Sequence, residues 1–299
     1  MLIAVALSLA QIVQPGVERH DPEIEALLRR RDEQRRAEAL QTPVDGGDDR
    51  AALTAVVPPA IAERLASCLA SANIKPADGI TAAQTWAREG GGAYAAQCHG
   101  YALGLDKQWT QAAAIFEAGA KTKGIDAVMR ARLYSQAGNA LLIAGNHAAA
   151  LRALDSALAL PLPRTLSTGE IHLDRARARV AANDLPGART DLNQAITLAA
   201  ADPLAWLLSA TLARRMNDLP LARLHIEEAA KRARNDAPIA LEQGIIYALS
   251  GGDDAAAIAA FSRAQELAGK TSEVGKQAAD YLVQLGQTPA PEKKLEGTR

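Results

Sequence analysis

Aromatic residues are scarce in this chain of 299 residues, which has two phenylalanines, five tyrosines and three tryptophans. Segments that alternate apolar and polar residues with a period of two are also scarce, whereas alanine is abundant. Half-buried β-strands need that alternation, and sheets favour aromatic and β-branched side chains. The two shortages argue against a β-sandwich and favour closely packed helices.

An excess of basic charge is missing too. The 33 Lys and Arg residues face 34 Asp and Glu residues, giving a net charge of −1, which argues against a general polyanion binder. The densest basic run, "RRRDEQRR" at 29–36, contains acids and fits the solvated face of a helix better than a nucleic-acid patch. We expect no nucleic-acid partner.

Signatures of catalysis and metal binding are absent. The five histidines are scattered, and no HExxH, GxSxG or Cys/His cluster brings reactive groups together. The sequence therefore predicts no enzyme, no metal and no cofactor. Histidines stand at the following positions: His20, His99, His147, His172 and His225.

One stretch, "AQELAGKTS" at 264–272, resembles the end of a phosphate-binding loop. A phosphate loop joins a strand to a helix N-terminus, but the residues upstream are Ala-rich and carry helical spacing. Gly269 fits a helix end, and Thr271 or Ser272 fits the cap of the next helix. The sequence predicts a helix–Gly–helix corner and no nucleotide site.

Cysteine is rare, and the two present, Cys68 and Cys98, form no CxxC motif for zinc or thioredoxin-type chemistry. An even count in an exported chain fits one disulfide, and two buried free thiols are the alternative.

The apolar start at 1–10 resembles a short signal peptide with Ser8-Leu9-Ala10 as a cleavage site, although no Lys or Arg precedes it. It is too short for a membrane span. These features favour a periplasmic or secreted protein, with a frayed N-terminus of a cytoplasmic protein as the alternative.

A repeated pattern organises the rest of the chain. Short polar turns recur at 105–109, 144–148, 182–186, 216–220 and 250–254, each between two apolar helical segments. The segment after each turn carries a small, a large apolar and a second small residue at i, i+4 and i+7, on one helix face. These triplets are Ala112, Phe116 and Gly119; Ala150, Leu154 and Ala157; Ala188, Leu192 and Ala195; Ala222, Ile226 and Ala229; and Ala257, Phe261 and Ala264.

The segment before each turn has its own small contact residue: Gly100, Gly138, Ala176, Ala210 and Gly244. Tyr134, His172 and Trp206 stand four residues ahead of it in the middle three repeats. With a spacing of about 34 to 38 residues, the pattern resembles the tetratricopeptide repeat (TPR) family over Ala93 to Leu267. Several signature aromatics are Leu or Ile, and "LPLPRTLST" lengthens one repeat. The resemblance implies an all-α fold, a right-handed superhelical solenoid of stacked antiparallel helix pairs.

The segments before and after the repeats are predicted to form separate elements. We expect a possible signal peptide at 1–10, a charged helix and flexible linker at 11–56, and a degenerate first hairpin at 57–92. Five TPR-like repeats follow at 93–268, then a capping helix at 269–286 that covers the last repeat. The tail at 287–299 is predicted to be disordered.

TPR-like arrays usually bind segments of other proteins, and the resemblance implies a protein or peptide partner on a concave wall built from the first helices. Residues expected on the solvent side of that wall are Tyr94, Tyr101, Arg132, Asn139, Arg177 and Arg214. They only partly match the cluster with which some family members clamp a carboxylate terminus, because a Lys near Asn139 is absent. We expect Arg177 and Arg214 to face acidic groups of the partner.

Two functions follow from the sequence. The first is a non-enzymatic scaffold that holds a protein or peptide in a bacterial envelope complex. The alternative is a structural protein that self-assembles through its N-terminal helix, although Ile24, Leu27, Leu28 and Ala37 do not sustain a heptad seam.

Overall fold

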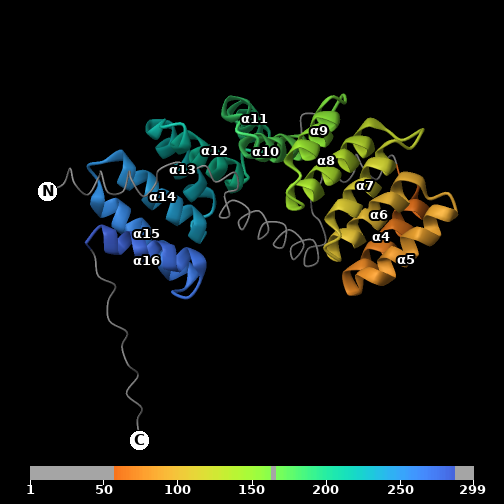
Figure 1. Cartoon of the computed structure of the whole chain (residues 1–299), viewed down its shortest axis with the longest axis horizontal. Coiled ribbons are helices and arrows are strands. Elements are labelled where there is room, and N and C mark those ends of the chain that lie inside the picture. The colour runs from red at the N-terminus through yellow and green to blue at the C-terminus, as the bar shows by residue number, and fades with distance from the viewer. Residues whose placement is uncertain (1–56, 163–165, 287–299) are drawn as a thin grey trace, which may run out of the picture. The chain divides into compact units, whose positions relative to one another are not determined.

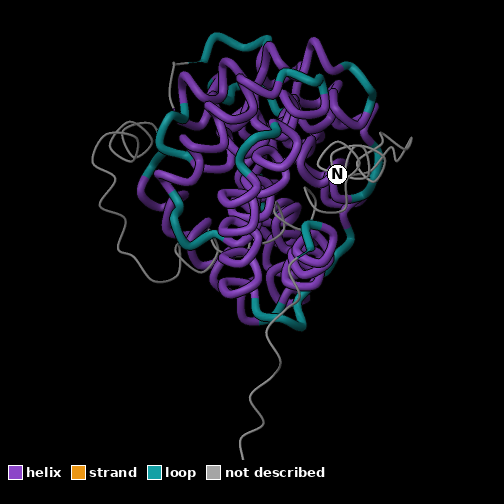
Figure 2. Tube along the Cα trace, turned by 90° about the vertical axis from the view of Figure 1, so that its left-hand side faces the viewer, coloured by secondary structure: helices purple, strands orange, loops and turns teal. Residues whose placement is uncertain are grey.

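A computed structural model of the protein describes residues 57–162 and 166–286 (Figure 1). The signal peptide predicted at 1–10, the charged helix and linker at 11–56 and the tail at 287–299 lie outside the described residues. Within the described residues the chain forms thirteen α-helices and no strand (Figure 2). The all-α fold predicted from the sequence is therefore confirmed.

The helices come in sequential pairs joined by short turns. Their bounds are α4 Pro59–Ile74, α5 Pro76–Arg88, α6 Gly92–Leu105, α7 Trp109–Ala120, α8 Ala127–Ile143, α9 His147–Leu158, α10 Leu166–Ala181, α11 Leu185–Leu198, α12 Pro203–Arg215, α13 Leu219–Arg232, α14 Ala237–Ser250, α15 Asp254–Ala268 and α16 Glu273–Gln284.

The described residues belong to two compact units that divide between Ala199 and Ala200. The N-terminal unit holds α4 to α11, and the C-terminal unit holds α12 to α16. In the N-terminal unit each helix packs on the next, and the first helices of successive pairs, α6, α8 and α10, also contact one another in order. In the C-terminal unit α12, α14 and α16 do the same. Each unit is thus a stack of helix pairs.

The turns inside the repeats share one chemistry. A residue with positive φ ends the first helix, and in most repeats an Asn or Asp directly after it caps the second helix. Asn146, for example, follows Gly145 and accepts a hydrogen bond from the Ala149 N–H at 3.2 Å. Such a cap satisfies a backbone donor that the helix itself leaves without a partner. The positive-φ residues are Lys107 (61°), Gly145 (75°), Asn183 (61°), Asn217 (60°) and, in the fifth repeat, Gly251 (71°) and Gly252 (79°).

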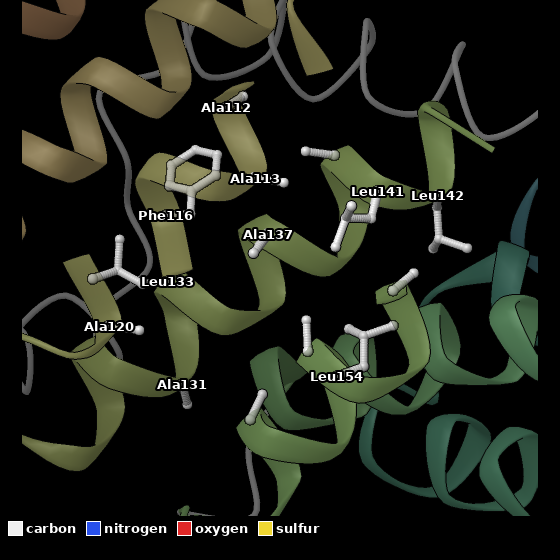
Figure 3. Packing of buried hydrophobic residues seen from close by; sticks show 14 of the residues in the cluster. Ala112, Ala113, Phe116, Ala120, Ala131, Leu133, Ala137, Leu141, Leu142 and Leu154 are labelled. Carbon is white, nitrogen blue, oxygen red and sulfur yellow. The ribbon is translucent and has the colours of Figure 1, made fainter. Parts of the chain in front are cut away.

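In the three repeats whose first helix carries a glycine at the contact position, the large apolar residue of the second helix packs against that glycine. A Cβ added to Gly138 of α8 would lie 2.6 Å from Cγ of Leu154 on α9. The same addition would place a Cβ 2.5 Å from the Phe116 ring at Gly100 and 2.6 Å from the Phe261 ring at Gly244. Figure 3 shows the result, with α8 lying between the helices that carry Phe116 and Leu154. The absence of a side chain is therefore what lets the paired helices approach.

The segment that resembles a phosphate-binding loop is a helix corner. Gly269, with φ of 78°, ends α15, and the Ser272 hydroxyl accepts a hydrogen bond from the Gly275 N–H at 3.0 Å to cap α16. Helix α16 then packs on α14 and α15, where Tyr281 stacks on Phe261 with ring centroids 4.8 Å apart. The predicted helix–Gly–helix corner is confirmed.

At the other end of the chain, α4 and α5 form a hairpin that packs on α6. The structure joins Cys68 of α4 to Cys98 of α6 by a disulfide, with the two Cα atoms 6.2 Å apart. Both cysteines are buried. The bond links the hairpin directly to the first helix of the first full repeat.

Replacing Gly138 with alanine tests the close approach of paired helices. A Gly→Ala change in a helix usually stabilises by about 0.5–1 kcal/mol. Here the new methyl would overlap Leu154, so we expect a net loss of about 1–3 kcal/mol in urea unfolding. In a Leu154→Ala background the overlap is gone, and the same change should stabilise. A stabilising Gly138→Ala in the wild-type background would contradict the close contact.

The disulfide yields a second prediction. Exchanging Cys68 and Cys98 for alanine should destabilise the α4–α5 hairpin by about 3–4 kcal/mol, because the bond closes a loop of 30 residues in the unfolded chain. Faster hydrogen exchange of the α4 and α5 amides would report this loss. Native protein isolated without reductant should show no free thiol. Labelling of both cysteines would mean that the bond is not formed.

Candidate functional site

The predicted wall residues lie on first helices, as their position in the repeat requires. Tyr94 and Tyr101 are on α6, Arg132 and Asn139 are on α8, and Arg177 is on α10, all in the N-terminal unit. The sixth, Arg214, is on α12 in the C-terminal unit. Five of the six residues therefore belong to one compact unit.

Tyr94 in the first turn of α6 and Arg132 in the second turn of α8 are half-buried and near enough to affect each other's charge. Burial raises the pKa of the Tyr94 phenol, and the charge of Asp126 raises it further against the opposing effect of Arg132. Burial also lowers the pKa of Arg132, while Asp126 and Tyr94 act in the other direction. Asp126 itself caps α8 by accepting the Met129 N–H at 2.8 Å. The group thus combines an aromatic ring with a partly desolvated cation.

Tyr101 and Asn139 lie together at a pocket of about 210 Å³ between α6, α7 and α8. Gln136, one helical turn before Asn139, is the third polar side chain of the lining. The remaining lining is apolar or glycine: Gly100, Gly104, Trp109, Ala112, Phe116, Ala140 and Ile143. We call this site the amide pocket.

The oxygen atoms of two carboxamide side chains at the amide pocket accept no hydrogen bond from the described residues. Oε1 of Gln136 and Oδ1 of Asn139 are buried, and neither has a hydrogen-bond partner among the described residues. The hydroxyl of Tyr101 is already used, because it donates to Oδ1 of Asn73 on α4 at 2.6 Å. Both oxygens have almost no accessible surface, so they are enclosed by the helices and not open to the space of the pocket.

Sequence reasoning identified Tyr101 and Asn139 but missed Gln136. A signal was available, since residues three apart share a helix face and Gln136 stands three positions before Asn139. It also missed the role of Asn73, because nothing in the local sequence indicates that α4 reaches Tyr101. That contact depends on how the first hairpin docks.

Arg177 is not a solvent-exposed cation. Its Nη1 lies 3.1 Å from Oδ1 of Asp174 on the same helix, and the two side chains are 7% and 3% exposed. The sequence-based expectation of a surface position is wrong for this residue. The acid that faces it belongs to the chain itself.

Arg214 also forms an ion pair within the chain, with a carboxylate that is distant in the sequence. Its Nε and Nη2 donate to the two carboxylate oxygens of Glu242 on α14, at 2.7 and 3.1 Å. The side chains are 13% and 8% exposed, so the expectation of a surface position is again wrong. The bidentate pair joins α12 to α14.

A third charged cluster surrounds Asp191, which is fully buried on α11. It accepts hydrogen bonds from Arg175 at 2.8 and 2.7 Å, contacts His172 Nδ1 at 2.8 Å and pairs with Arg179 at 3.0 Å. Burial raises the pKa of the Asp191 carboxyl, but His172 and the two arginines outweigh it and leave the pKa below its ordinary value. The three partners of Asp191 all lie on α10, so the cluster joins α10 to α11, and Arg175 extends it to α9 by donating to Asp155 at 2.9 Å.

No group of three or more His, Cys, Asp or Glu side chains within 57–162 and 166–286 is placed to hold a metal ion. Over the same residues, no helix combines the length and the apolar character needed to cross a membrane.

Comparisons with known proteins identify the fold. No protein-family model and no curated protein matches the sequence. PilF of Pseudomonas aeruginosa is structurally similar, with a TM-score of 0.59 at 12% identity over 73% of this chain and 97% of PilF. A chain of the APC/C hetero-tetramer Cut9–Hcn1 gives a TM-score of 0.54 at 17% identity, over 74% of this chain and 44% of the other.

YrrB, described as a TPR protein with an unusual peptide-binding site, gives a TM-score of 0.51 at 15% identity. The match covers 66% of this chain and 96% of YrrB. Together with the repeated small–large–small contacts, these similarities define the class. The chain has the tetratricopeptide-repeat fold.

The pair of Arg214 and Glu242 gives a prediction about stability. Arg214→Met should cost about 3–5 kcal/mol in urea unfolding, because it leaves a buried carboxylate without its main cation. Adding Glu242→Leu should restore most of the loss. A control at an exposed arginine is Arg223→Met, which removes the contacts with Glu227, Asp253 and the Tyr247 ring and should change stability by less than about 1 kcal/mol. Equal small effects at both sites would contradict a buried structural pair.

Proposed function

We propose that this protein is a non-enzymatic scaffold that binds a segment of a partner protein on the first helices of its N-terminal unit. The observation that carries the proposal is that Tyr101 and Asn139, from successive first helices, line one pocket. First helices in a stacked array form its binding wall. The TPR fold supports this role, and the peptide-binding site of YrrB offers a precedent on the same fold.

The absence of an enzymatic role is part of the proposal. The buried charged groups are committed to ion pairs that join helices, as at Asp191 and at Arg214 with Glu242. The amide pocket offers carboxamides and a phenol, which recognise hydrogen-bonding partners but are weak acids and bases near neutral pH. Its chemistry supports recognition.

We also propose that the protein works in the cell envelope or outside the cell. The apolar start at 1–10 supports export, and a Cys68–Cys98 disulfide would persist in an oxidising compartment. A cytoplasmic location would leave these thiols reduced. Thiol state in protein taken directly from cells therefore distinguishes the two locations.

The test is partner capture by the full-length protein. A Tyr94→Leu/Arg132→Met variant keeps apolar bulk but removes the phenol and the charge from the wall. We expect capture of a defined protein from the envelope fraction to fall at least about tenfold, a difference worth about 1.4 kcal/mol. The control is Arg152→Met, which removes an exposed arginine from the second helix α9.

Each alternative has its own outcome in this experiment. Unchanged capture by the wall variant, with melting temperatures alike, places binding elsewhere on the molecule. Capture of only further copies of the chain supports the self-assembling structural protein.

A further inference from the structure

We propose that the Cys68–Cys98 disulfide completes the binding wall: its formation docks α4 on α6, and the docked α4 fixes Tyr101 at the amide pocket. The reduced protein has a released α4 and an incomplete wall. This inference rests on the proposed function and adds the condition under which the wall binds. It follows from the weak packing of α4, the firm packing of α5 and the contact between α4 and Tyr101.

Helix α4 has little apolar contact with the rest of its unit. Only two of its sixteen residues are buried, and one of them is Cys68 itself. Among the described residues, the apolar cluster around the disulfide has three buried members, which are Cys68, Ala83 and Cys98. Leu65 and Leu69 of α4 lie beside it but are only partly buried. Apolar stabilisation follows the area removed from water, so the disulfide supplies most of what holds α4 on α6.

The polar contacts of α4 with α5 do not replace the bond. Arg64 pairs with Glu89, directly after α5, and its Cζ lies 5.2 Å from the centre of the Trp86 ring. The side chains of Arg64 and Glu89 are 46% and 52% exposed. Exposed pairs contribute little to stability, because water screens them and ordering two long side chains costs entropy. We therefore expect α4 to leave its place when the cysteines are reduced.

Helix α5 is held to the unit by contacts of its own. Its Trp86 is buried and lies so close to Gly91 that a Cβ added there would be 2.5 Å from the indole ring. Ile80 of α5 packs against the large apolar core that begins at α6. Neither contact involves α4, so α5 stays on α6 when α4 is released.

Release of α4 changes the wall at Tyr101. The Tyr101 hydroxyl donates to Oδ1 of Asn73 on α4 at 2.6 Å, and Tyr101 lines the amide pocket. Tyr101 stands three residues after Cys98 on α6. Asn73 stands five residues after Cys68 on α4, so the hydrogen bond and the disulfide join the same two helices about one turn apart. Fixing a side chain before a partner arrives removes the entropy cost of ordering it on binding.

Formation of the bond needs a disulfide-bearing oxidant, either a small molecule or a protein. The Cys68 thiolate attacks one sulfur of the oxidant, which forms a mixed disulfide and releases the other oxidant sulfur as a thiolate. The Cys98 thiolate then attacks the Cys68 sulfur and releases the second oxidant sulfur. Two electrons pass to the oxidant, and the two protons lost by the cysteines end on its sulfurs.

Docking of α4 also protects the bond once it has formed. Cys68 is 5% exposed and Cys98 is 0% exposed, so a reducing thiolate reaches neither sulfur unless α4 opens. The wall is therefore completed on oxidation and stays complete. This one-way behaviour agrees with the proposed export, in which the chain meets its oxidant after leaving the cytoplasm.

Tyrosine ring signals in NMR spectra of the full-length protein test the link between α4 and the pocket. The Tyr101 signal is assigned with Tyr101→Phe. In the oxidised protein we expect Asn73→Ala to shift this signal, because it removes the hydrogen-bond acceptor. In a Cys68→Ala/Cys98→Ala background, where α4 is released, the same change should leave the signal in place. An equal shift in both backgrounds, or no shift in either, overturns the inference.

The control for this measurement is Asn193→Ala, at an exposed position of α11. It makes the same chemical change away from α4 and should leave the Tyr101 signal unchanged in both backgrounds. A shift equal to that of Asn73→Ala would mean that the signal does not report the contact with α4, and it also overturns the inference.

Hydrogen exchange on the unmutated protein gives a second measurement. The chain is oxidised with glutathione disulfide, or unfolded and refolded in dithiothreitol. The amides of α4 should exchange at least about a hundredfold faster in the reduced protein, because the bond closes a loop of 30 residues. The amides of α8 and α9 should change by less than about threefold. Unchanged exchange in α4, or an equal increase in all of these helices, contradicts a bond that acts on α4.

Partner capture separates this inference from the proposed function. The Cys68→Ala/Cys98→Ala variant should retain at most about a tenth of the protein that the oxidised wild type captures. If it captures as much as the wild type while Tyr94→Leu/Arg132→Met loses the partner, the proposed function stands and the inference fails. If no form captures any protein, the proposed function fails, and the Tyr101 signal and the α4 amides decide whether oxidation docks α4.

Discussion

The contact between a small residue on one helix and a large apolar residue on its paired helix is the constraint on which this structure depends. At Gly138 and Leu154 the fit leaves no room for a single added methyl group. The same contact recurs at Gly100 and Gly244, so the two helices of these pairs also approach closely. The face of a first helix that is not used in this contact is free for polar and aromatic residues. The amide pocket borders this contact, because Gly100 and Phe116 line it together with Tyr101 of α6 and Asn139 of α8.

Buried polar groups in this protein fall into two kinds. Asp191 and the pair of Arg214 with Glu242 have their partners within the chain, and their hydrogen bonds fix helices to one another. Gln136 and Asn139 have carboxamide oxygens that the chain leaves unpaired. A satisfied network adds rigidity, whereas an unsatisfied acceptor is destabilising unless a ligand supplies a donor.

Each end of the described chain is closed by an additional element. Helix α16 packs over α14 and α15, and Tyr281 stacks on Phe261, the large packing residue of the last repeat. The α4–α5 hairpin packs over α6 and is joined to it through Cys68 and Cys98. Stacked repeats need such covers because a terminal pair exposes an apolar face. The hairpin has a further effect, since Asn73 of α4 fixes the hydroxyl of Tyr101 at the amide pocket.

The sequence by itself determined the helix pairs, their turns and their contacts. These features depend on residues close together in the chain, such as Gly138 with Leu154 or the cap at Asn146, so periodicity and turn chemistry suffice to predict them. The same reasoning placed Tyr101 and Asn139 on the first helices. Only the tertiary structure decided which wall residues remain available. Glu242 is 28 residues from Arg214, and it neutralises that arginine because stacking brings α14 against α12. Pairing between distant residues is set by packing, and no local pattern encodes it.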